Sequence, residues 1–170
     1  NILVLSLLFC LALGHPSILK LDTDPDCFNP EKALIASYHI HLIFMELNEE
    51  QNAIALQLRE EFLDHFDSKL GAPCVDLMEN DHSCIFPVDE GAAGPFPTSN
   101  WAVYVLPEHV HEMTWWMQQR RQGLSLLVHP NTGCQIEDHS DWALWGGAAW
   151  PLDLTVMSHD DPYPWDETLQ

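Results

Sequence analysis

The chain contains the stretch Tyr38-His39-Ile40-His41-Leu42-Ile43-Phe44, which is rich in aromatic and branched residues and has no glycine or proline. This composition predicts a strand over residues 36–45. Side chains at positions i and i+2 share one face of a strand, so we expect His39 and His41 to point the same way. Because neutral imidazole is the commonest metal-binding side chain, the pair suggests a metal centre.

The sequence that follows this strand predicts two helices and three more strands. Asn48 is a suitable N-cap for a first helix that runs to about Phe66. A second helix is expected to open at Pro107-Glu108, as a proline at the first helical position does, and to stop at Gly123. Further strands are expected over residues 83–88, 101–106 and 124–128.

This order, β-α-β-β-α-β, predicts an α+β fold of the ferredoxin-like type, an antiparallel sheet with two helices on one face. In that topology the first strand lies between the third and fourth strands and runs antiparallel to both. Its start therefore lies beside the ends of strands 101–106 and 124–128. Since Glu108 follows one of these ends and His129 follows the other, both are expected near His39 and His41 at one edge of the sheet.

Length and charge limit the classes of function. The 170 residues suggest one domain with a substantial hydrophobic core. With 26 acidic and 6 basic side chains, the net charge of −20 would repel nucleic acid and anionic membrane surfaces. No G-x-S-x-G, P-loop or G-x-G-x-x-G motif is present to indicate those chemistries. A small neutral or cationic partner is favoured.

The segments outside this domain have distinct compositions. Residues 2–13 form an apolar run that is too short to span a bilayer but suits a signal peptide. We therefore expect residues 1–14 to be a signal peptide truncated at its start, and the protein to be secreted and extracellular; a buried N-terminal strand or helix is the alternative. Residues 15–35 should form an extended lead-in, residues 36–153 the domain, and residues 154–170 a weakly ordered acidic tail.

Removal of Cys10 with the signal peptide would leave four cysteines in the secreted chain. An even number in a secreted protein favours two disulfides. Cys74 and Cys84 bracket a polar loop and are the natural local pair, which would leave Cys27 to pair with Cys134. Thiolate metal ligation is the alternative, but no C-x-x-C spacing supports it.

Histidines in strands have a structural interpretation as well. A single strand histidine is usually bonded to a backbone carbonyl, whereas two on one face with a third converging favour a metal site. His139 follows Glu137-Asp138 in an acidic segment that would ordinarily be solvated. A tryptophan-rich C-terminal extension with Trp142, Trp145 and Trp150 could close over His139 and exclude water from the site.

Several segments, taken in order, resemble the DOPA 4,5-dioxygenase family over residues 37–153. The resemblance is carried by Tyr38-His39-Ile40-His41, Gly94-Pro95-Phe96-Pro97, the strand 101–106 with Pro107-Glu108, Leu127-Val128-His129-Pro130-Asn131-Thr132-Gly133, and Asp138-His139 through Ala143-Leu144-Trp145-Gly146. It implies a ferredoxin-like α+β fold and an extradiol enzyme, which opens a catechol ring beside its hydroxyl pair with O2 and non-haem Fe(II).

The resemblance also implies roles for individual residues. The metal ligands would be His39, His41 and His129, with Glu108 as the carboxylate that completes the usual iron triad. His139 would move protons. The substrate pocket would include Trp101, Asn131 and Trp145.

The resemblance leaves the metal and the activity open. Fe(II) is the expected cofactor, with zinc or another divalent metal as alternatives. The expected partners are a small catechol and O2, and a homodimer is left open. Two other hypotheses remain: a secreted, non-catalytic protein that binds a metal or a small aromatic, and an interaction module whose histidines are structural.

Overall fold

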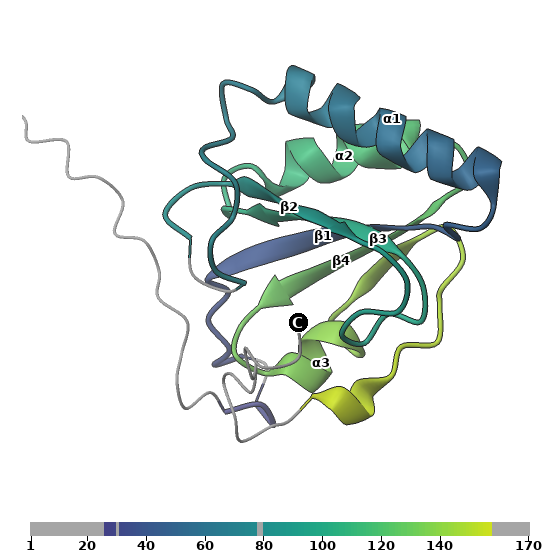
Figure 1. Cartoon of the computed structure of the whole chain (residues 1–170). Coiled ribbons are helices and arrows are strands. Elements are labelled where there is room, and N and C mark those ends of the chain that lie inside the picture. The colour runs from purple at the N-terminus through teal and green to yellow at the C-terminus, as the bar shows by residue number, and fades with distance from the viewer. Residues whose placement is uncertain (1–25, 30, 78–79, 158–170) are drawn as a thin grey trace, which may run out of the picture.

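The computed structural model describes residues 26–29, 31–77 and 80–157, and its centre is a five-stranded antiparallel sheet (Figure 1). The strands are β1 (Ser37–Ile43), β2 (Cys84–Asp89), β3 (Asn100–Val105), β4 (Ser125–Asn131) and β5 (Leu144–Gly146). The helical elements are α1 (Glu49–His65), α2 (Val110–Arg120), the short α3 (Gln135–His139) and the 3₁₀ turn Leu154–Val156. The expected signal peptide (1–14) and most of the expected tail (154–170) lie outside the described residues.

The strand order is β2-β3-β1-β4-β5, which makes β1 the centre of the sheet. β1 runs antiparallel to both β3 and β4, as the order of elements in the sequence predicts. His39 lies directly opposite His129 of β4 and opposite Tyr104 of β3. The register therefore brings the third histidine to the first two, although 88 positions in the sequence separate His41 from His129.

One face of the sheet packs against α1 and α2, which lie together on the same side of it (Figure 1). The core between them is apolar and fully enclosed; its members include Ile40, Leu42, Leu58, Phe62, Trp101, Val103, Met113, Met117 and Leu126. Alternation along each strand sends these residues to one side and their neighbours to the other. The two main helices of the α+β fold thus cover a single face.

Trp101 belongs to this core, and its prediction as a pocket residue is wrong. Its side chain has 0% exposure, packs against Phe62 of α1 and donates from Nε1 to the carbonyl oxygen of Ala55 at 3.0 Å. Because side chains alternate along β3, Asn100 and Tyr104 occupy the opposite face instead. The tryptophan therefore stabilises the helix layer and lies across the sheet from the histidines.

The two main helices begin differently from one another. The Asn48 side chain accepts a hydrogen bond from the Gln51 backbone N–H, which confirms it as the N-cap of α1. α2 begins at Val110, three residues later than predicted, because Pro107 lies in a turn in which the His109 N–H bonds the Leu106 carbonyl. No described helix has the length and apolarity that crossing a bilayer requires.

The chain beyond His129 is more regular than its composition predicts. β4 continues through Pro130 to Asn131, and α3 and β5 follow within the tryptophan-rich extension. Proline is tolerated here because β5 pairs only with residues 126–128 of β4, so one side of β4 carries no strand at position 130. β5 adds a fifth strand that the sequence did not indicate.

The described chain contains one local and one long-range disulfide. Cys74 is bonded to Cys84 and Cys27 to Cys134, which confirms both predicted pairings. Cys134 is the residue that immediately precedes α3. The second disulfide therefore attaches the lead-in segment to the start of the helix that ends at His139.

Candidate metal centre

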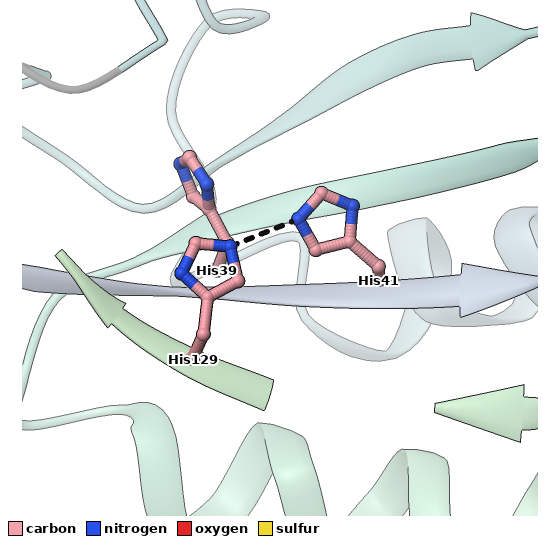
Figure 2. Close-up of side chains that lie close together, drawn as sticks. All are labelled: His39, His41 and His129. Atoms are coloured by element: carbon pink, nitrogen blue, oxygen red, sulfur yellow. Dashed lines mark hydrogen bonds between the residues drawn. The ribbon is translucent and has the colours of Figure 1, made fainter. Parts of the chain in front are cut away.

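Three histidines converge on the face of the sheet that α1 and α2 leave uncovered (Figure 2). His39 and His41 come from β1 and His129 from β4, and one ligand atom from each lies within 4.8 Å of the others. Their exposures are 5%, 8% and 1%. Three buried imidazoles with converging nitrogens have the arrangement of a metal site, in which nitrogen donors surround one point.

Hydrogen bonds fix which nitrogen of two of these rings carries hydrogen. His41 Nδ1 lies 3.0 Å from Asn100 Oδ1, and His129 Nδ1 lies 2.9 Å from the carbonyl oxygen of Pro130. An oxygen of either kind only accepts, so each Nδ1 donates and each neutral ring keeps a lone pair on Nε2. This is how metal-binding histidines are usually oriented, with the outer nitrogen bonded to protein.

The two Nε2 atoms of His41 and His129 approach to 3.2 Å (Figure 2). With Nδ1 as the donor in both rings, two lone pairs face each other, and this contact is repulsive unless a cation lies between or beside them. Ligand bonds of roughly 2.0–2.1 Å would put adjacent nitrogens about 3.0–3.4 Å apart. The observed distance fits two ligands of one metal ion.

A proton could satisfy the same pair of lone pairs, but the surroundings oppose it. Desolvation by burial lowers the pKa of His41 to about 3, and it also holds the pKa of His129 well below the usual value. Burial is likewise the largest cause that lowers the pKa of His39, followed by the neighbouring His41. Neutral imidazole is the form that binds metal, so burial favours the metal-binding form of these rings over the protonated form.

His39 supplies a third nitrogen in the same place. Among the described residues, its buried Nε2 has no hydrogen-bond partner. Burial lowers the pKa of the ring, and a hydrogen bond with the Leu77 backbone acts in the opposite direction. An orphaned buried nitrogen is costly unless something binds it. Its position beside His41 and His129 would let a single cation bind all three rings.

His139 lies next to this group without being part of it. Its ring centre is 3.9 Å from that of His129 and 6.5 Å from that of His41. Its Nδ1 donates to the Gln135 carbonyl at 2.9 Å, so Nε2 keeps a lone pair, and burial lowers the pKa of the ring to about 4. The residue ends helix α3, where an acidic loop was predicted, and it can accept a proton.

Asp138 holds α3 against the end of β4. Its carboxylate accepts hydrogen bonds from the Thr132 backbone N–H at 3.0 Å and from the Thr132 hydroxyl at 2.8 Å. The group is almost fully buried, and desolvation raises its pKa to about 7 although both hydrogen bonds lower it. This clamp fixes the position of His139 relative to His129, since one residue adjoins the clamp and the other lies on β4.

Aromatic rings surround the histidines. Phe96 lies 4.5 Å from His41, and Phe86 and Tyr104 meet the edge of His39 at 5.4 Å and 5.8 Å, all measured between ring centres. These contacts exclude water from the imidazoles.

The two other predicted pocket residues lie on the histidine face. Trp145 pairs with Leu127 on this face and packs in a small apolar cluster with Phe96. Asn131 lies two residues from His129 on the same face, is fully buried and donates to the Ser37 hydroxyl at 2.8 Å.

The structure does not bring Glu108 to the histidines. It is exposed in the turn between β3 and α2, and no group of ligand atoms among the described residues joins it to His39. The reason is that the chain leaves the sheet after Val105 and turns toward α2, which covers the opposite face. The described site therefore offers three imidazoles, and no carboxylate shares their cluster.

Sequence reasoning missed the polar and aromatic neighbours of the triad, above all Asn100, Phe86 and Tyr104. A signal for two of them was present, since Asn100 and Tyr104 alternate with Trp101 along a single strand. With the register of β1 and β3 known, Tyr104 falls opposite His39, and Asn100 lies opposite Ile43, two positions beyond His41. Without the register, the face that they occupy was ambiguous.

Comparison with known proteins decides the family. The model of the Dopa 4,5-dioxygenase family matches residues 38–156, which include all three clustered histidines and His139. The chain belongs to the DOPA 4,5-dioxygenase family. This agrees with the resemblance in the sequence and extends it to the end of the described domain.

Individual relatives of this DOPA 4,5-dioxygenase family member are distant. A protein from Amanita muscaria named DOPA 4,5-dioxygenase is 26% identical over 151 residues, 85% of this chain and 60% of its own length. An uncharacterized 21.2 kDa protein from Botryotinia fuckeliana is 27% identical over 135 residues, 75% of this chain and 66% of its own. The chain thus spans less than two thirds of either relative.

A solved structure is similar as well. The crystal structure of a candidate dioxygenase from Nostoc punctiforme matches with a TM-score of 0.55 and 29% identity. The match covers 72% of this chain and 90% of the Nostoc protein. The fold described above is therefore shared with a protein of known structure.

Proposed function

We propose that the protein is an extradiol dioxygenase, which cleaves the ring of DOPA or a related catechol with O2 at a non-haem iron. In this reaction the carbon–carbon bond beside the hydroxyl pair breaks and both atoms of O2 enter the product, so no external reductant is needed. The observation that carries the proposal is the 3.2 Å approach of two Nε2 lone pairs, those of His41 and His129, in a member of this family.

His39, His41 and His129 would hold the metal through their nitrogens. The chemistry that Fe(II) supplies when bound is the activation of O2 toward a chelated catechol. Zinc or another divalent ion suits the same donors, since imidazole is a ligand for many metals. The protein itself keeps the three imidazoles neutral by burial, orients two of them by hydrogen bonds and shields them from water in the metal-free state.

His139 would serve as the group that accepts and returns a proton. Catechol hydroxyls lose protons when they bind as ligands, and ring opening requires proton transfer to the product. The free Nε2 lone pair and the pKa of about 4 make His139 a neutral acceptor, and its ring is adjacent to that of His129. A positioned acid–base group of this kind contributes roughly 10²–10⁴-fold to a rate.

Phe96, Phe86 and Tyr104 would line the approach to the metal and exclude water from it. Their rings lie against His41 and His39, and an aromatic substrate could pack on the same surfaces once side chains adjust. Trp145, and Asn131 with its buried amide, are proposed as further pocket residues on this face. The proposed partners are a small catechol and O2.

The test is catechol-dependent O2 uptake by protein loaded anaerobically with Fe(II). A panel of DOPA and related catechols should consume O2 and give a coloured ring-opened product. His41→Ala should lose both metal and uptake, whereas the matched control His111→Ala, on the exposed surface of α2, should keep both. Iron-loaded protein that stays silent with the whole panel would exclude the enzyme.

A second candidate is a non-catalytic binder of a divalent metal or a small aromatic, descended from the same family. The observation in its favour is the deep burial of all three histidines without a carboxylate in their cluster. It predicts stoichiometric metal binding with no O2 uptake, so the same preparation separates the two functions.

We further propose that the protein is secreted and that its fold is ferredoxin-like. The two disulfides support secretion, because such bonds persist in oxidising compartments. The order β2-β3-β1-β4 supports the ferredoxin-like assignment, with β5 added beside β4. Recovery of the expressed protein from the medium, with its cysteines resistant to alkylation before reduction, tests the first of these.

A further inference from the structure

We propose that Asn100 is a positioning residue that sets the tautomer of His41, and that Asp89 orients the Asn100 amide for this task. The inference rests on the proposed metal site but can be tested without a metal. It assigns a role to a line of hydrogen bonds that crosses three neighbouring strands, from β2 through β3 to β1.

The line begins at the edge of the sheet and ends among the histidines. Asp89 pairs with Asn100 across β2 and β3, and Asn100 Nδ2 donates to Asp89 Oδ2 at 3.5 Å. The other end of the same amide, Oδ1, accepts from His41 Nδ1 at 3.0 Å. Beyond this ring, His41 Nε2 faces His129 Nε2 at 3.2 Å.

The direction of the amide decides which nitrogen of His41 carries hydrogen. A carboxylate only accepts, so Asp89 draws the NH2 end of Asn100 and turns its oxygen toward His41. Were the amide reversed, its NH2 group would meet Nδ1, and the ring hydrogen would move to Nε2. That hydrogen would then lie between His41 and His129, where the metal is proposed to bind.

Burial makes this control effective. Asn100 has 1% exposure and His41 has 8%, so water cannot replace the amide as a partner for Nδ1. Asp89 differs: the residue is exposed at the edge strand while its carboxyl group is partly shielded. It therefore orients a buried neighbour from a position at the boundary with solvent.

Removal of the acceptor should reverse the tautomer. In Asn100→Leu, which has a similar volume and no acceptor, Nδ1 loses its partner and the ring gains by placing its hydrogen on Nε2. The resulting N–H can donate to His129 Nε2, which already lies at hydrogen-bond distance. Both Nε2 atoms would then be engaged in a hydrogen bond with each other instead of being free to bind metal. Metal affinity should fall by roughly 10–100-fold, as for other residues that orient a ligand.

The tautomer is read from long-range ¹H–¹⁵N correlation spectra of metal-free protein with ¹⁵N-labelled histidine at neutral pH. The wild-type protein should show His41 with hydrogen on Nδ1, and Asn100→Leu should show it on Nε2. Asn100→Asp combined with Asp89→Asn returns an oxygen acceptor beside His41 without two adjacent carboxylates, so it should restore the wild-type spectrum. Zn²⁺ affinity, measured by competition with a chromophoric chelator, should fall and recover in the same order.

Two further variants keep the test decisive. Asn131→Leu removes a buried asparagine amide from the same face, one that bonds Ser37, and should leave the His41 tautomer unchanged. Asp89→Leu lies at the exposed edge, so it tests the orienting role even if Asn100→Leu fails to fold, and it should give a mixture of tautomers.

A wild-type ring with hydrogen on Nε2, or a tautomer that Asn100→Leu and Asp89→Leu both leave unchanged, would overturn the proposal. Failure of the proposed enzyme function appears separately, as correct tautomers without O2 uptake.

Discussion

The two faces of the central sheet come from alternate residues of the same strands, yet they differ in whether their buried polar atoms have hydrogen-bond partners. Ile40, Leu42 and Trp101 face α1 and α2, and their few polar atoms have partners. His39 and His41 alternate with them along β1 and face the other way, where buried nitrogens meet without hydrogens between them. Trp101 Nε1 on the helix face thus has a partner within the fold, whereas His39 Nε2 on the histidine face has none among the described residues.

This contrast separates the source of stability from the source of function. Burial of apolar side chains stabilises a fold by about 25 cal/mol per Å² and needs no further component. A buried group with no partner instead lowers stability, by about 1–3 kcal/mol for each polar atom. Such groups are expected where binding occurs, because the ligand recovers the energy.

The largest expected effect is the loss of metal on removal of a clustered histidine. In His129→Ala one of the two facing nitrogens is gone, so metal affinity should fall by more than the roughly 100-fold that loss of an orienting partner causes. Metal content after dialysis measures this, with His111→Ala as the control. Retention of a full equivalent of metal by His129→Ala would contradict the assignment of the histidine face as the metal site.

The next effect concerns turnover alone. His139→Gln keeps a polar side chain next to His129 but removes the proton acceptor, so kcat should fall by roughly 10²–10⁴-fold while bound iron stays the same. Steady-state O2 uptake and metal analysis on one preparation measure both quantities. If iron is lost together with activity, His139 is a ligand and the proposed division of roles is incorrect.

The helix face should respond through stability rather than function. Trp101→Ala leaves a cavity between β3 and α1, and the free energy of unfolding should fall by about 3–5 kcal/mol. Trp115→Ala on the exposed side of α2 is the matched control and should change it by no more than about 0.5 kcal/mol. Urea denaturation of the metal-free proteins gives both values. Equal effects from the two tryptophans would contradict the assigned core.

The histidine face should also make the stability of the metal-free protein depend on pH. Burial lowers the pKa of His39, His41, His129 and His139, so below about pH 6.5 the unfolded chain takes up protons that the folded chain does not. Stability should therefore fall as pH drops from about 6.5 toward 4. Asp138 acts in the opposite sense, because its raised pKa of about 7 makes the folded state hold a proton in this range.

Burial also raises the pKa of Asp89, but four histidines outnumber the two carboxyl groups, so the protein should be more stable at neutral pH than at acid pH. Each net proton contributes about 1.4 kcal/mol per pH unit. Urea midpoints at pH 6.5, 5.5 and 4.5 measure the slope, and Asp138→Asn should make it steeper. A midpoint that rises on acidification would show that the histidine face is not held neutral.

The parts of the fold that depend on strong local patterns were predictable from the sequence. Asn48 marks the start of α1, and the order of elements gives the neighbours of β1, because these follow from side-chain chemistry and topology. α3 and β5 were not predictable, since each is short and forms through tertiary contacts such as the Asp138 clamp. Local propensity contributes little to elements of three to five residues.

The site was predictable in its histidines and not in its partners. His39, His41 and His129 follow from strand alternation and topology alone. Glu108 was assigned from its place at the end of strand 101–106 and Trp101 from the family resemblance, but a turn and a change of face carry them away from the site. Asn100 became visible only with the register of β1 and β3, because a polar residue in a strand can face either side.

X-ray absorption at the metal edge, on protein loaded with one equivalent of Fe(II) without oxygen, tests the central claim most directly. The expected spectrum shows three imidazole nitrogens at roughly 2.1 Å, with the multiple scattering that such rings produce. His129→Ala should remove one of them or abolish binding. A metal bound by oxygen or sulfur with fewer than two imidazoles, or no stoichiometric binding at all, would contradict the assignment of this face as a metal centre.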